Sequence, residues 1–442
     1  MDSTSLALAR AFAFGLLLSV PTVLAEAPPS PHRQLPKAMH GSMSERASIS
    51  VGTPGSSATL SGTDNVALQA AVDYVAALGG GTVEIRAGTF LMRDSLHLRP
   101  HVTVRGQGDA TVLRKAPAAV SPLALDGDFG EEQVTIAKAD GFRVGDGIAV
   151  WDKRAGGFHT TVGRITGRNG NTFSVSRPLM ADCMVENDAM AASVFPVVSG
   201  YDAEGARIEN LTIEGSKADN IHLNGCRGAG IFLYRSHGAV ISGCVVRGYN
   251  GDGISFQQSN DVQVTGCIAE DNASLGLHPG SGSQRPQVKN NIARRNGEDG
   301  LFLCWRVKEG VFSGNTLEAN GRFGISIGHK DTDNLLQDNR VLANAHDGIF
   351  FRNESEGMAG HRNRIENNVI ENNGTKEPSA GIRVRGETRD LVLRNNTIRD
   401  TRSGADRRQT TGIRIEEKAG PITTEANRIE ADVAIDDRRP KT

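Results

Sequence analysis

Basic, aromatic and imidazole side chains recur at similar places in successive repeats of this sequence, between residues 278 and 354. A guanidinium or ammonium group neutralises a carboxylate, and an imidazole takes up or releases a proton near neutral pH. Side chains of these types on one face are therefore suited to removing a proton beside a neutralised carboxylate. The residues concerned are His278, Trp305, Arg306, His329, Lys330, Arg352 and Glu354.

These residue types suggest a role for each position. We assign catalysis to His278, His329 and Lys330, and substrate binding to Arg306, Arg352, Trp305 and Glu354. The cations Arg306, Lys330 and Arg352 would hold carboxylates, while one of the two histidines moves the proton. If the oxygen on the adjacent carbon then leaves, the reaction is an elimination. If a proton returns from the other face, it is an epimerisation.

Ordinary structural roles are the alternative for most of these positions. Arg306 and Arg352 also fit solvated charges at strand ends, Trp305 fits packing under a loop, and residues 329–331 fit a polar turn. His278 is harder to explain in this way, because residues 276–283 read Gly-Leu-His-Pro-Gly-Ser-Gly-Ser. Proline and glycine there predict a break in an otherwise regular strand, and such breaks are where functional sites are found.

Three Asp-Gly pairs indicate a rival chemistry. Asp252, Asp299 and Asp347 recur two repeats apart, which places them about 9.6 Å apart along a stacked structure, close to the carboxylate spacing of inverting glycosidases. Asp-Gly is also an ordinary turn signal. A Ca²⁺ site built from Glu270, Asp271, Glu298 or Asp299 has no loop pattern in its favour, so no cofactor is expected.

Regular repeats must position these residues. A glycine followed by an aliphatic residue opens each repeat, and neighbouring openings are 23, 23, 24, 24, 24, 33 and 31 residues apart. Self-similarity at this period indicates a solenoid. The openings are Gly230-Ile231, Gly253-Ile254, Gly276-Leu277, Gly300-Leu301, Gly324-Ile325, Gly348-Ile349, Gly381-Ile382 and Gly412-Ile413.

The repeat composition predicts a parallel β-helix. Ile, Val, Phe and Gly dominate, no stretch within a repeat fits an amphipathic helix, and leucine-rich repeats would need more leucine. A second ladder of polar residues, Cys244, Cys267, Asn291, Asn315, Asn339, Asn368 and Asn396, runs in phase with the first. Stacked amides would satisfy the polar groups of a buried turn. We therefore predict an all-β, right-handed parallel β-helix whose Ile254, Leu277, Leu301, Ile325 and Ile349 stack inside.

Residues 62–115 carry a family resemblance. Asp64 caps an apolar-periodic helix containing Gln69 and Ala71, followed by the triple glycine 79–81 and by Gly-Thr-Phe at 88–90. This segment resembles the N-terminal part of the pectate-lyase-like superfamily of right-handed β-helix proteins. The resemblance implies a helix that plugs the open end of the solenoid. It does not imply one reaction, because this fold hosts lyases, hydrolases, epimerases and binding proteins.

One segment is similar in position to a motif of the β-helix alginate epimerases, Gly-x-Asp-Pro-His. Here His278 stands where that family has Asp, and Gly280 stands where it has His. The epimerase assignment is therefore not carried over.

Composition changes along the chain predict five parts. We expect a secretory signal at 1–25, a flexible linker at 26–60, the cap and first coils at 61–119, a small antiparallel β insertion at 120–200 and the repeats at 201–442. Export predicts a secreted or periplasmic location without a stable membrane anchor after signal cleavage. Of the 5 Cys, Cys244 and Cys267 sit in the Asn ladder and are expected as small buried side chains.

These observations converge on one functional hypothesis. The net charge of −2 argues against a nucleic-acid partner. The cationic face favours an acidic, uronate-containing polysaccharide, cleaved by β-elimination. A glycoside hydrolase or uronate epimerase on the same fold is the alternative within enzymes. A non-catalytic polysaccharide-binding or surface protein is the alternative of another class.

Overall fold

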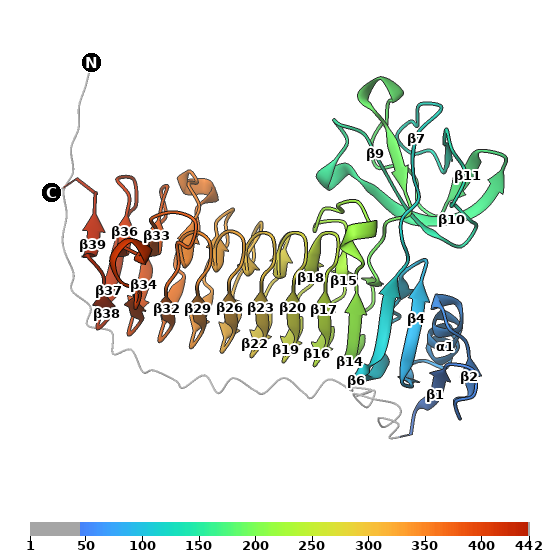
Figure 1. Cartoon of the computed structure of the whole chain (residues 1–442), viewed down its shortest axis with the longest axis horizontal. Coiled ribbons are helices and arrows are strands. Elements are labelled where there is room, and N and C mark those ends of the chain that lie inside the picture. The colour runs from blue at the N-terminus through green and yellow to red at the C-terminus, as the bar shows by residue number, and fades with distance from the viewer. Residues whose placement is uncertain (1–44, 441–442) are drawn as a thin grey trace, which may run out of the picture. The chain divides into compact units, whose positions relative to one another are not determined.

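The structure is a computed structural model that describes residues 45–440. The predicted signal segment and the first part of the predicted linker lie outside these residues. From residue 46 onward the chain forms one compact unit, a stack of parallel coils with a lobe of antiparallel strands near its N-terminal end (Figure 1). The fold class predicted from the repeats is confirmed.

Two parallel sheets, here called sheets A and B, form the walls of the stack. Sheet A contains β1 (Ala47–Gly52), β2 (Leu60–Ser61), β3 (Gly81–Ile85), β4 (Gly88–Met92), β6 (Val102–Lys115), β14 (Arg207–Glu214), β16 (Val240–Ser242), β17 (Val245–Arg247), β19 (Gln263–Thr265), β20 (Ile268–Glu270), β22 (Gln287–Lys289), β23 (Ile292–Arg294), β25 (Val311–Ser313), β26 (Thr316–Glu318), β28 (Leu335–Gln337), β29 (Arg340–Leu342), β31 (Arg364–Glu366), β32 (Val369–Glu371), β34 (Leu391–Arg394), β35 (Thr397–Arg399), β37 (Ile422–Glu425) and β38 (Arg428–Glu430). Sheet B contains β5 (Leu96–His97), β13 (Val198–Tyr201), β15 (Ala229–Tyr234), β18 (Asp252–Gln257), β21 (Leu277–Gly280), β24 (Leu301–Phe302), β27 (Ile325–Ile327), β30 (Ile349–Phe351), β33 (Ala380–Val384), β36 (Thr411–Ile415) and β39 (Val433–Asp437).

Sheet C is the antiparallel lobe, and its strands pair in the order β7-β12-β9-β10-β11-β8. Its members are β7 (Val120–Pro122), β8 (Gln133–Thr135), β9 (Gly147–Trp151), β10 (Thr161–Asn169), β11 (Thr172–Val175) and β12 (Met190–Ala192). The lobe has a hydrophobic core of its own, which includes Phe142 and Phe173. Five 3-10 helices are short: η1 (Gly157–His159), η2 (Val185–Asn187), η3 (Lys217–Asp219), η4 (Glu356–Met358) and η5 (Gly404–Asp406).

The aliphatic stack predicted inside the solenoid is confirmed. Each member pairs with the next in parallel register: Ile254 with Leu277, Leu277 with Leu301, Leu301 with Ile325, and Ile325 with Ile349. All five are at most 2% exposed. Alternation along each strand places the intervening residues on the opposite face.

Asparagine side chains form the predicted ladder, which runs from coil to coil in the direction of the solenoid axis. The Nδ2 of Asn315 donates to Oδ1 of Asn339 at 3.0 Å, and the same bond recurs from Asn291 to Asn427. A parallel ladder runs from Asn272 to Asn373 and ends on Oε1 of Gln409. Because each amide bonds the next coil, polar groups inside the turns are satisfied without water.

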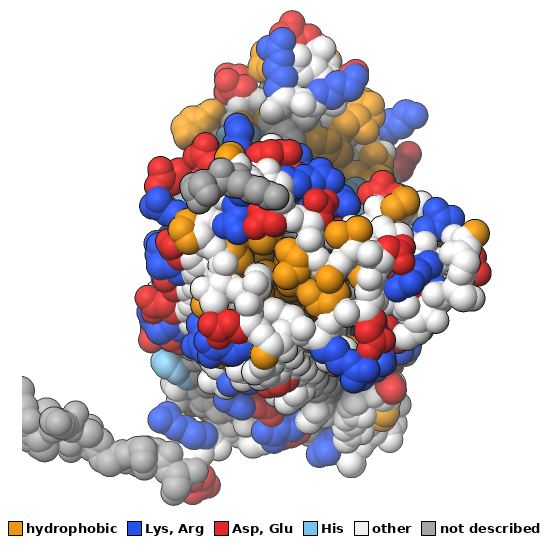
Figure 2. Space-filling view, turned by 90° about the vertical axis from the view of Figure 1, so that its left-hand side faces the viewer, with side chains coloured by type: hydrophobic (Ala, Val, Ile, Leu, Met, Phe, Trp, Pro, Cys, Tyr) orange, Lys and Arg blue, Asp and Glu red, His pale blue; other side chains and the backbone are white. Residues whose placement is uncertain are grey.

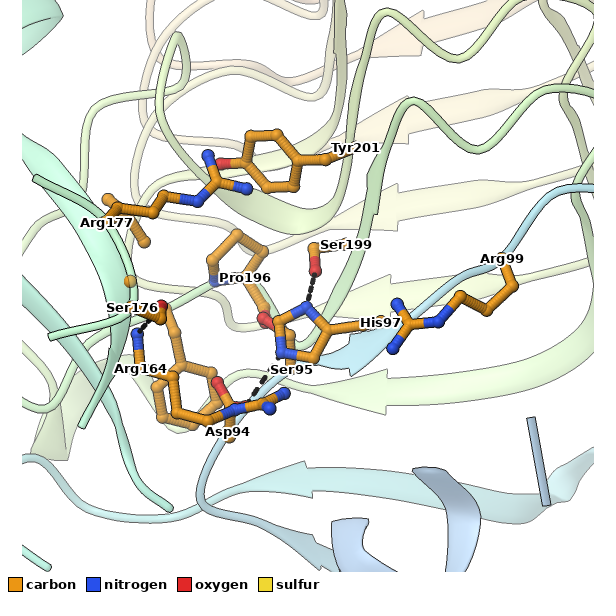
Figure 3. A pocket seen from close by; sticks show the side chains of 13 residues that line it. Asp94, Ser95, His97, Arg99, Arg164, Ser176, Arg177, Pro196, Ser199 and Tyr201 are labelled. Atoms are coloured by element: carbon orange, nitrogen blue, oxygen red, sulfur yellow. Dashed lines mark hydrogen bonds and ion pairs between the residues drawn. The ribbon is translucent and has the colours of Figure 1, made fainter. Parts of the chain in front are cut away.

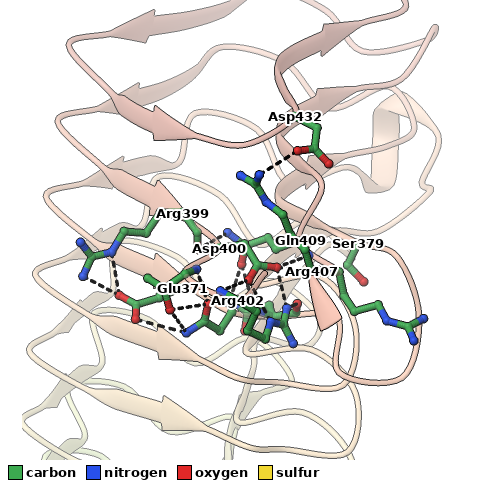
Figure 4. Close-up of polar contacts among 12 residues, drawn as sticks. Glu371, Ser379, Arg399, Asp400, Arg402, Arg407, Gln409 and Asp432 are labelled. Atoms are coloured by element: carbon green, nitrogen blue, oxygen red, sulfur yellow. Dashed lines mark hydrogen bonds and ion pairs between the residues drawn. The ribbon is translucent and has the colours of Figure 1, made fainter. Parts of the chain in front are cut away.

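A buried carboxylate supports the end of the ladder that runs from Asn272 to Gln409. Asp400 accepts hydrogen bonds from Nη2 of Arg402 and from the backbone N–H of Gln409, each at 2.7 Å (Figure 4). Burial raises the pKa of Asp400, but Arg402 and the backbone N–H groups of residues 408 and 409 outweigh it and lower the pKa to about 2. Gln409 is thereby held in place as the last acceptor of the ladder.

The helix α1 (Asn65–Ala77) covers the N-terminal end. Asp64 caps it by accepting a hydrogen bond from the Val66 N–H at 3.0 Å, and its apolar residues pack into the main core. Gln69 exchanges two hydrogen bonds with the backbone of His97, which lies on the first strand of sheet B. This amide takes the place of a neighbouring strand at the sheet edge.

The structure differs from the sequence predictions at two places. The linker predicted for 26–60 extends too far, because Ala47–Gly52 forms β1, which pairs with β3 and buries Val51. The break predicted at 276–283 is also wrong in part. Residues 277–280 form β21, paired with β18, because Pro279 lacks only an N–H and its neighbours still complete the ladder.

At the C-terminal end the last coil leaves part of its core open. Val433 and Ile435 are 46% and 44% exposed, and Figure 2 shows hydrophobic side chains there ringed by charged ones.

In the described part of the chain, no helix has the length and apolar character needed to cross a membrane.

Candidate active site

A cavity of about 280 Å³ opens on the outer face of sheet B, around His278. Its walls come from strands β18, β21 and β24, from the turns that follow β24 and β27, and from the segment of residues 222–226. Phe158, from the antiparallel lobe, also lines it. Ser255 Oγ donates to the Gly225 carbonyl at 2.7 Å, so this segment covers part of the outer face of sheet B.

His278 is held by a carboxylate on the neighbouring strand. Its Nδ1 lies 2.7 Å from Oδ2 of Asp252, and both side chains are buried. Burial lowers the pKa of His278, but the hydrogen bond to Asp252 and the adjacent Cys304 outweigh it and raise the pKa to about 10. His278 is therefore an imidazolium at neutral pH. Its Nε2 has no hydrogen-bond partner among residues 45–440.

Two thiols line the same cavity. Cys226 and Cys304 are both buried and both free. Contact with Cys226, together with burial, raises the pKa of the Cys304 thiol. Cys304 is therefore a neutral thiol rather than a thiolate nucleophile.

His329 has the opposite protonation state. Its Nε2 lies 2.9 Å from Oε1 of Glu354, and burial together with the Arg352 guanidinium lowers its pKa to about 4. At neutral pH the imidazole is uncharged, and its protonated Nε2 faces the Glu354 carboxylate. Its Nδ1, which then carries a lone pair, has no hydrogen-bond partner in the described chain.

Aromatic rings fix the orientation of both imidazoles. The ring of Trp305 lies 5.4 Å from that of His329, and Phe302 contacts His278 edge-on at the same centroid distance. The Arg352 guanidinium lies 4.5 Å from the centre of the Phe302 ring. Through these contacts both histidines pack against the side chains that form the base of the cavity.

Two successive turns beside the cavity each contain a consecutive pair of residues in the left-handed region, a conformation that single residues adopt at turns throughout the described coils. Trp305 and Arg306 both take positive φ values, 63° and 68°, and His329 and Lys330 do the same one coil later, at 49° and 65°. Left-handed geometry disfavours residues with a Cβ by roughly 1–2 kcal/mol each. Such strain gathers at functional sites.

The structure brings together only some of the residues assigned from the sequence. His278, His329 and Trp305 line the cavity, whereas Arg306 and Lys330 are exposed outside its lining. Arg352 and Glu354 are not among the residues that line the cavity. Arg352 donates to the Ser326 hydroxyl, to the Leu303 carbonyl and to Asp331, so its donors are directed into the protein.

Two charged residues of the cavity were not assigned to the site from the sequence, since Glu298 was considered only as a Ca²⁺ ligand and Arg322 not at all. Glu298 and Arg322 line it and lie 3.3 Å apart. A signal for them existed, because each stands two residues before the glycine that opens a repeat, in consecutive coils.

The carboxylates considered for hydrolysis or for Ca²⁺ have other partners. Asp252 binds His278, and burial raises the pKa of Asp299 to about 6. Asp347 accepts a hydrogen bond from the Ala380 N–H. Glu270 and Asp271 both pair with Arg295.

Fold and cavity together define the class, a right-handed parallel β-helix protein with a helix over the N-terminal end of its solenoid and a polar cavity on one sheet. The chain belongs to the NosD family. The family model described as periplasmic copper-binding protein (NosD) matches residues 130–293 and 209–409, more than half of the chain. No curated protein sequence matches the chain significantly.

Solved structures share the fold. The A-module of the mannuronan C-5 epimerase AlgE4 from Azotobacter vinelandii is 15% identical, with a TM-score of 0.53, over 86% of this chain and 97% of that one. The catalytic domain of a GH87 α-1,3-glucanase, solved with tetrasaccharides, is 11% identical with a TM-score of 0.53, over 81% and 56%. The Dettilon tailspike protein is 15% identical with a TM-score of 0.50, over 83% and 59%. At these identities the likeness concerns the fold.

The family description names copper, a metal that binds soft or borderline donors. Cys226, Cys304 and His278 are soft or borderline donors that line one cavity. Within residues 45–440, however, no three or more His, Cys, Asp or Glu side chains are arranged to hold a metal ion. The described residues therefore do not fit a copper site, and no chemical step below involves one.

Proposed function

We propose that this protein acts on an acidic polysaccharide outside the cytoplasm and cleaves it by β-elimination in the His278 cavity. The observation that carries the proposal is a pair of histidines lining one cavity with pKa values displaced in opposite directions. Environments that separate the pKa values of two such groups assign one as acid and the other as base.

The roles follow from the protonation states. His329 is neutral, and its Nδ1 removes the proton from the carbon beside the uronate carboxylate. The C–H electron pair forms the C=C bond as the bond to the leaving oxygen breaks. His278 is cationic, and its Nε2–H supplies the proton for that oxygen. Glu354 orients His329, and Asp252 orients His278.

Neutralising the substrate carboxylate is assigned to Arg322. Its side chain lines the cavity, whereas Arg306 and Lys330, for which we expected this role, do not. A uronate carboxylate entering beside Arg322 would compete with Glu298 for the guanidinium. Arg352 acts indirectly, because its charge adds to the effect of burial in lowering the pKa of His329.

The comparisons support the broad class of substrate and the location. The family is described as periplasmic, and two structural relatives are described as a mannuronan epimerase and a glucanase solved with tetrasaccharides. Trp305, Phe302 and Phe158 supply aromatic surface to the cavity, as a sugar site requires.

The test is the ultraviolet absorbance of unsaturated uronates after incubation with a panel of polyuronates and neutral glycans. We expect product from an acidic glycan only. His278→Ala and His329→Ala should each lower kcat/KM by on the order of a hundredfold or more. His346→Ala is the matched control, because His346 also contacts a glutamate but lies outside the cavity lining.

Other products would overturn the proposed reaction. New reducing ends without the absorbance identify a hydrolase, and an altered uronate composition without cleavage identifies an epimerase. Binding without any product identifies a non-catalytic polysaccharide-binding protein.

A further inference from the structure

A second cavity, of about 200 Å³, lies where the antiparallel lobe meets the first coils (Figure 3). Residues of β10 and of the turn after β11 form one wall, and residues of β5, β13 and their flanks form the other. Three arginines, Arg99, Arg164 and Arg177, and one carboxylate, Asp94, line it. The cavity is therefore cationic.

One wall is held by a chain of hydrogen bonds. Oδ2 of Asp94 lies 2.8 Å from Nε2 of His97, and Nδ1 of His97 lies 3.0 Å from the Ser199 hydroxyl (Figure 3). Ser199 is only 1% exposed, so this chain fixes the wall rather than presenting a nucleophile. Asp94 also pairs with Arg164, and Asp73 of α1 pairs with Arg99 at 2.7 Å.

Arg177 is the arginine of this cavity that lacks an acidic partner. No carboxylate lies within ion-pairing distance of it in residues 45–440, although both other arginines have one. Its guanidinium stacks on the ring of Tyr201, with the central carbon 3.6 Å from the ring centre (Figure 3). Tyr201 in turn packs against Phe232 and Tyr234. A fixed cation beside aromatic surface suits a sugar ring that carries a carboxylate.

The two cavities share one face of sheet B. Strand register connects His97 to Ser199, Ser199 to Phe232, Phe232 to Ser255 and Ser255 to His278. Four strand spacings of about 4.8 Å separate the two histidines by roughly 19 Å. A chain of a few sugar units is long enough to span that distance.

We infer that the Arg177 cavity is a second binding site for an acidic sugar residue, separate from the His278 cavity. The inference rests on the proposed substrate class but not on the proposed reaction. Arg177 pairs with the carboxylate, and the Tyr201 cluster contacts the sugar ring. The site anchors an acidic polysaccharide at a distance from the reacting bond.

Calorimetric titration with a uronate tetramer tests the site. Arg177→Gln should weaken binding about tenfold, the usual loss for one charge-assisted hydrogen bond, and Arg177→Lys should weaken it less. Arg168→Gln is the matched control, because Arg168 is exposed on the same lobe outside the cavity lining, and it should leave the affinity unchanged. Equal affinity of the parent protein and Arg177→Gln would overturn the site.

Two further arms separate the explanations. Sodium sulfate that competes with the tetramer at equal concentration would overturn the sugar assignment and leave a simple oxyanion site. The titration is repeated with His278→Ala, in which elimination is abolished if the proposed function is right. Binding that still depends on Arg177 there supports the inference, even when no glycan is ever cleaved.

Discussion

Oδ2 of Asp252 lies 2.7 Å from Nδ1 of His278, across the neighbouring strands β18 and β21, and both side chains are buried. A buried imidazole would ordinarily lose its proton. The aspartate reverses that outcome, and His278 stays charged where no solvent supports it. The proposed acid therefore depends on one carboxylate supplied by the previous coil.

Asp252→Asn should lower the pKa of His278, because the larger of the two contributions that oppose burial would be lost and only that of Cys304 would remain. The pKa is measured by NMR titration of labelled histidine. The rate of elimination at neutral pH should fall as the pKa of His278 falls. Asp347→Asn is the control, since Asp347 stands at the same place in a later repeat and accepts a backbone N–H without a histidine. An unchanged His278 pKa would contradict the assignment.

The low pKa of His329 depends on burial and on Arg352. The acidic limb of the kcat/KM profile should therefore lie near pH 4, since the base must be unprotonated. Arg352→Gln should move this limb toward higher pH, whereas Arg352→Lys, which keeps the charge, should leave it near pH 4. Circular dichroism must show that both variants fold. A limb that is the same in both variants would show that the charge of Arg352 does not act on the base.

Lys115 should make stability depend on pH. Its ammonium is buried against Ser193 and Asn220, and burial lowers its pKa to about 7. Between pH 7 and about 10.5 the unfolded chain binds this proton and the folded chain does not, so the free energy of unfolding rises with pH. Urea titrations should show this rise, on the order of a few kcal/mol, relative to Lys115→Met. Parallel pH profiles for the two proteins would refute the prediction.

Ile325→Asp tests the register of the aliphatic stack. Ile325 is fully buried between Leu301 and Ile349, so a carboxylate there has no partner and no water. The variant should unfold or aggregate. Val433→Asp is the control, because Val433 is 46% exposed on the last coil. A soluble Ile325→Asp variant with unchanged melting temperature would contradict the register.

Asn315→Ala tests the ladder. The Asn315 side chain accepts two hydrogen bonds from Asn291 and donates to Val288 and Asn339. At about 1 kcal/mol each, their loss should lower the free energy of unfolding by roughly 4 kcal/mol. Asn427→Ala, at the half-buried end of the same ladder, should cost less. Equal losses in urea titrations would contradict a dependence of the loss on burial along the ladder.

The repeat in the sequence by itself determined most of the fold. A side-chain period of two, a glycine at each opening and an asparagine at each turn leave one way to stack the coils, so Ile325 and Asn315 could be placed from spacing alone. His278, His329 and Trp305 could be brought to one face for the same reason. The spacing in the sequence indicates which residues occupy equivalent positions in successive coils.

Only the tertiary structure decided which segments cover each row of equivalent residues and which way a side chain points. The segment 222–226 and Phe158 close over His278, and no repeat encodes them. Arg352 turns inward to Asp331, while Arg322 lines the cavity in its place. Protonation follows from burial and neighbouring charge, which depend on contacts between distant segments. The opposite pKa values of His278 and His329, two residues of one type on one face, are therefore a property of the folded chain.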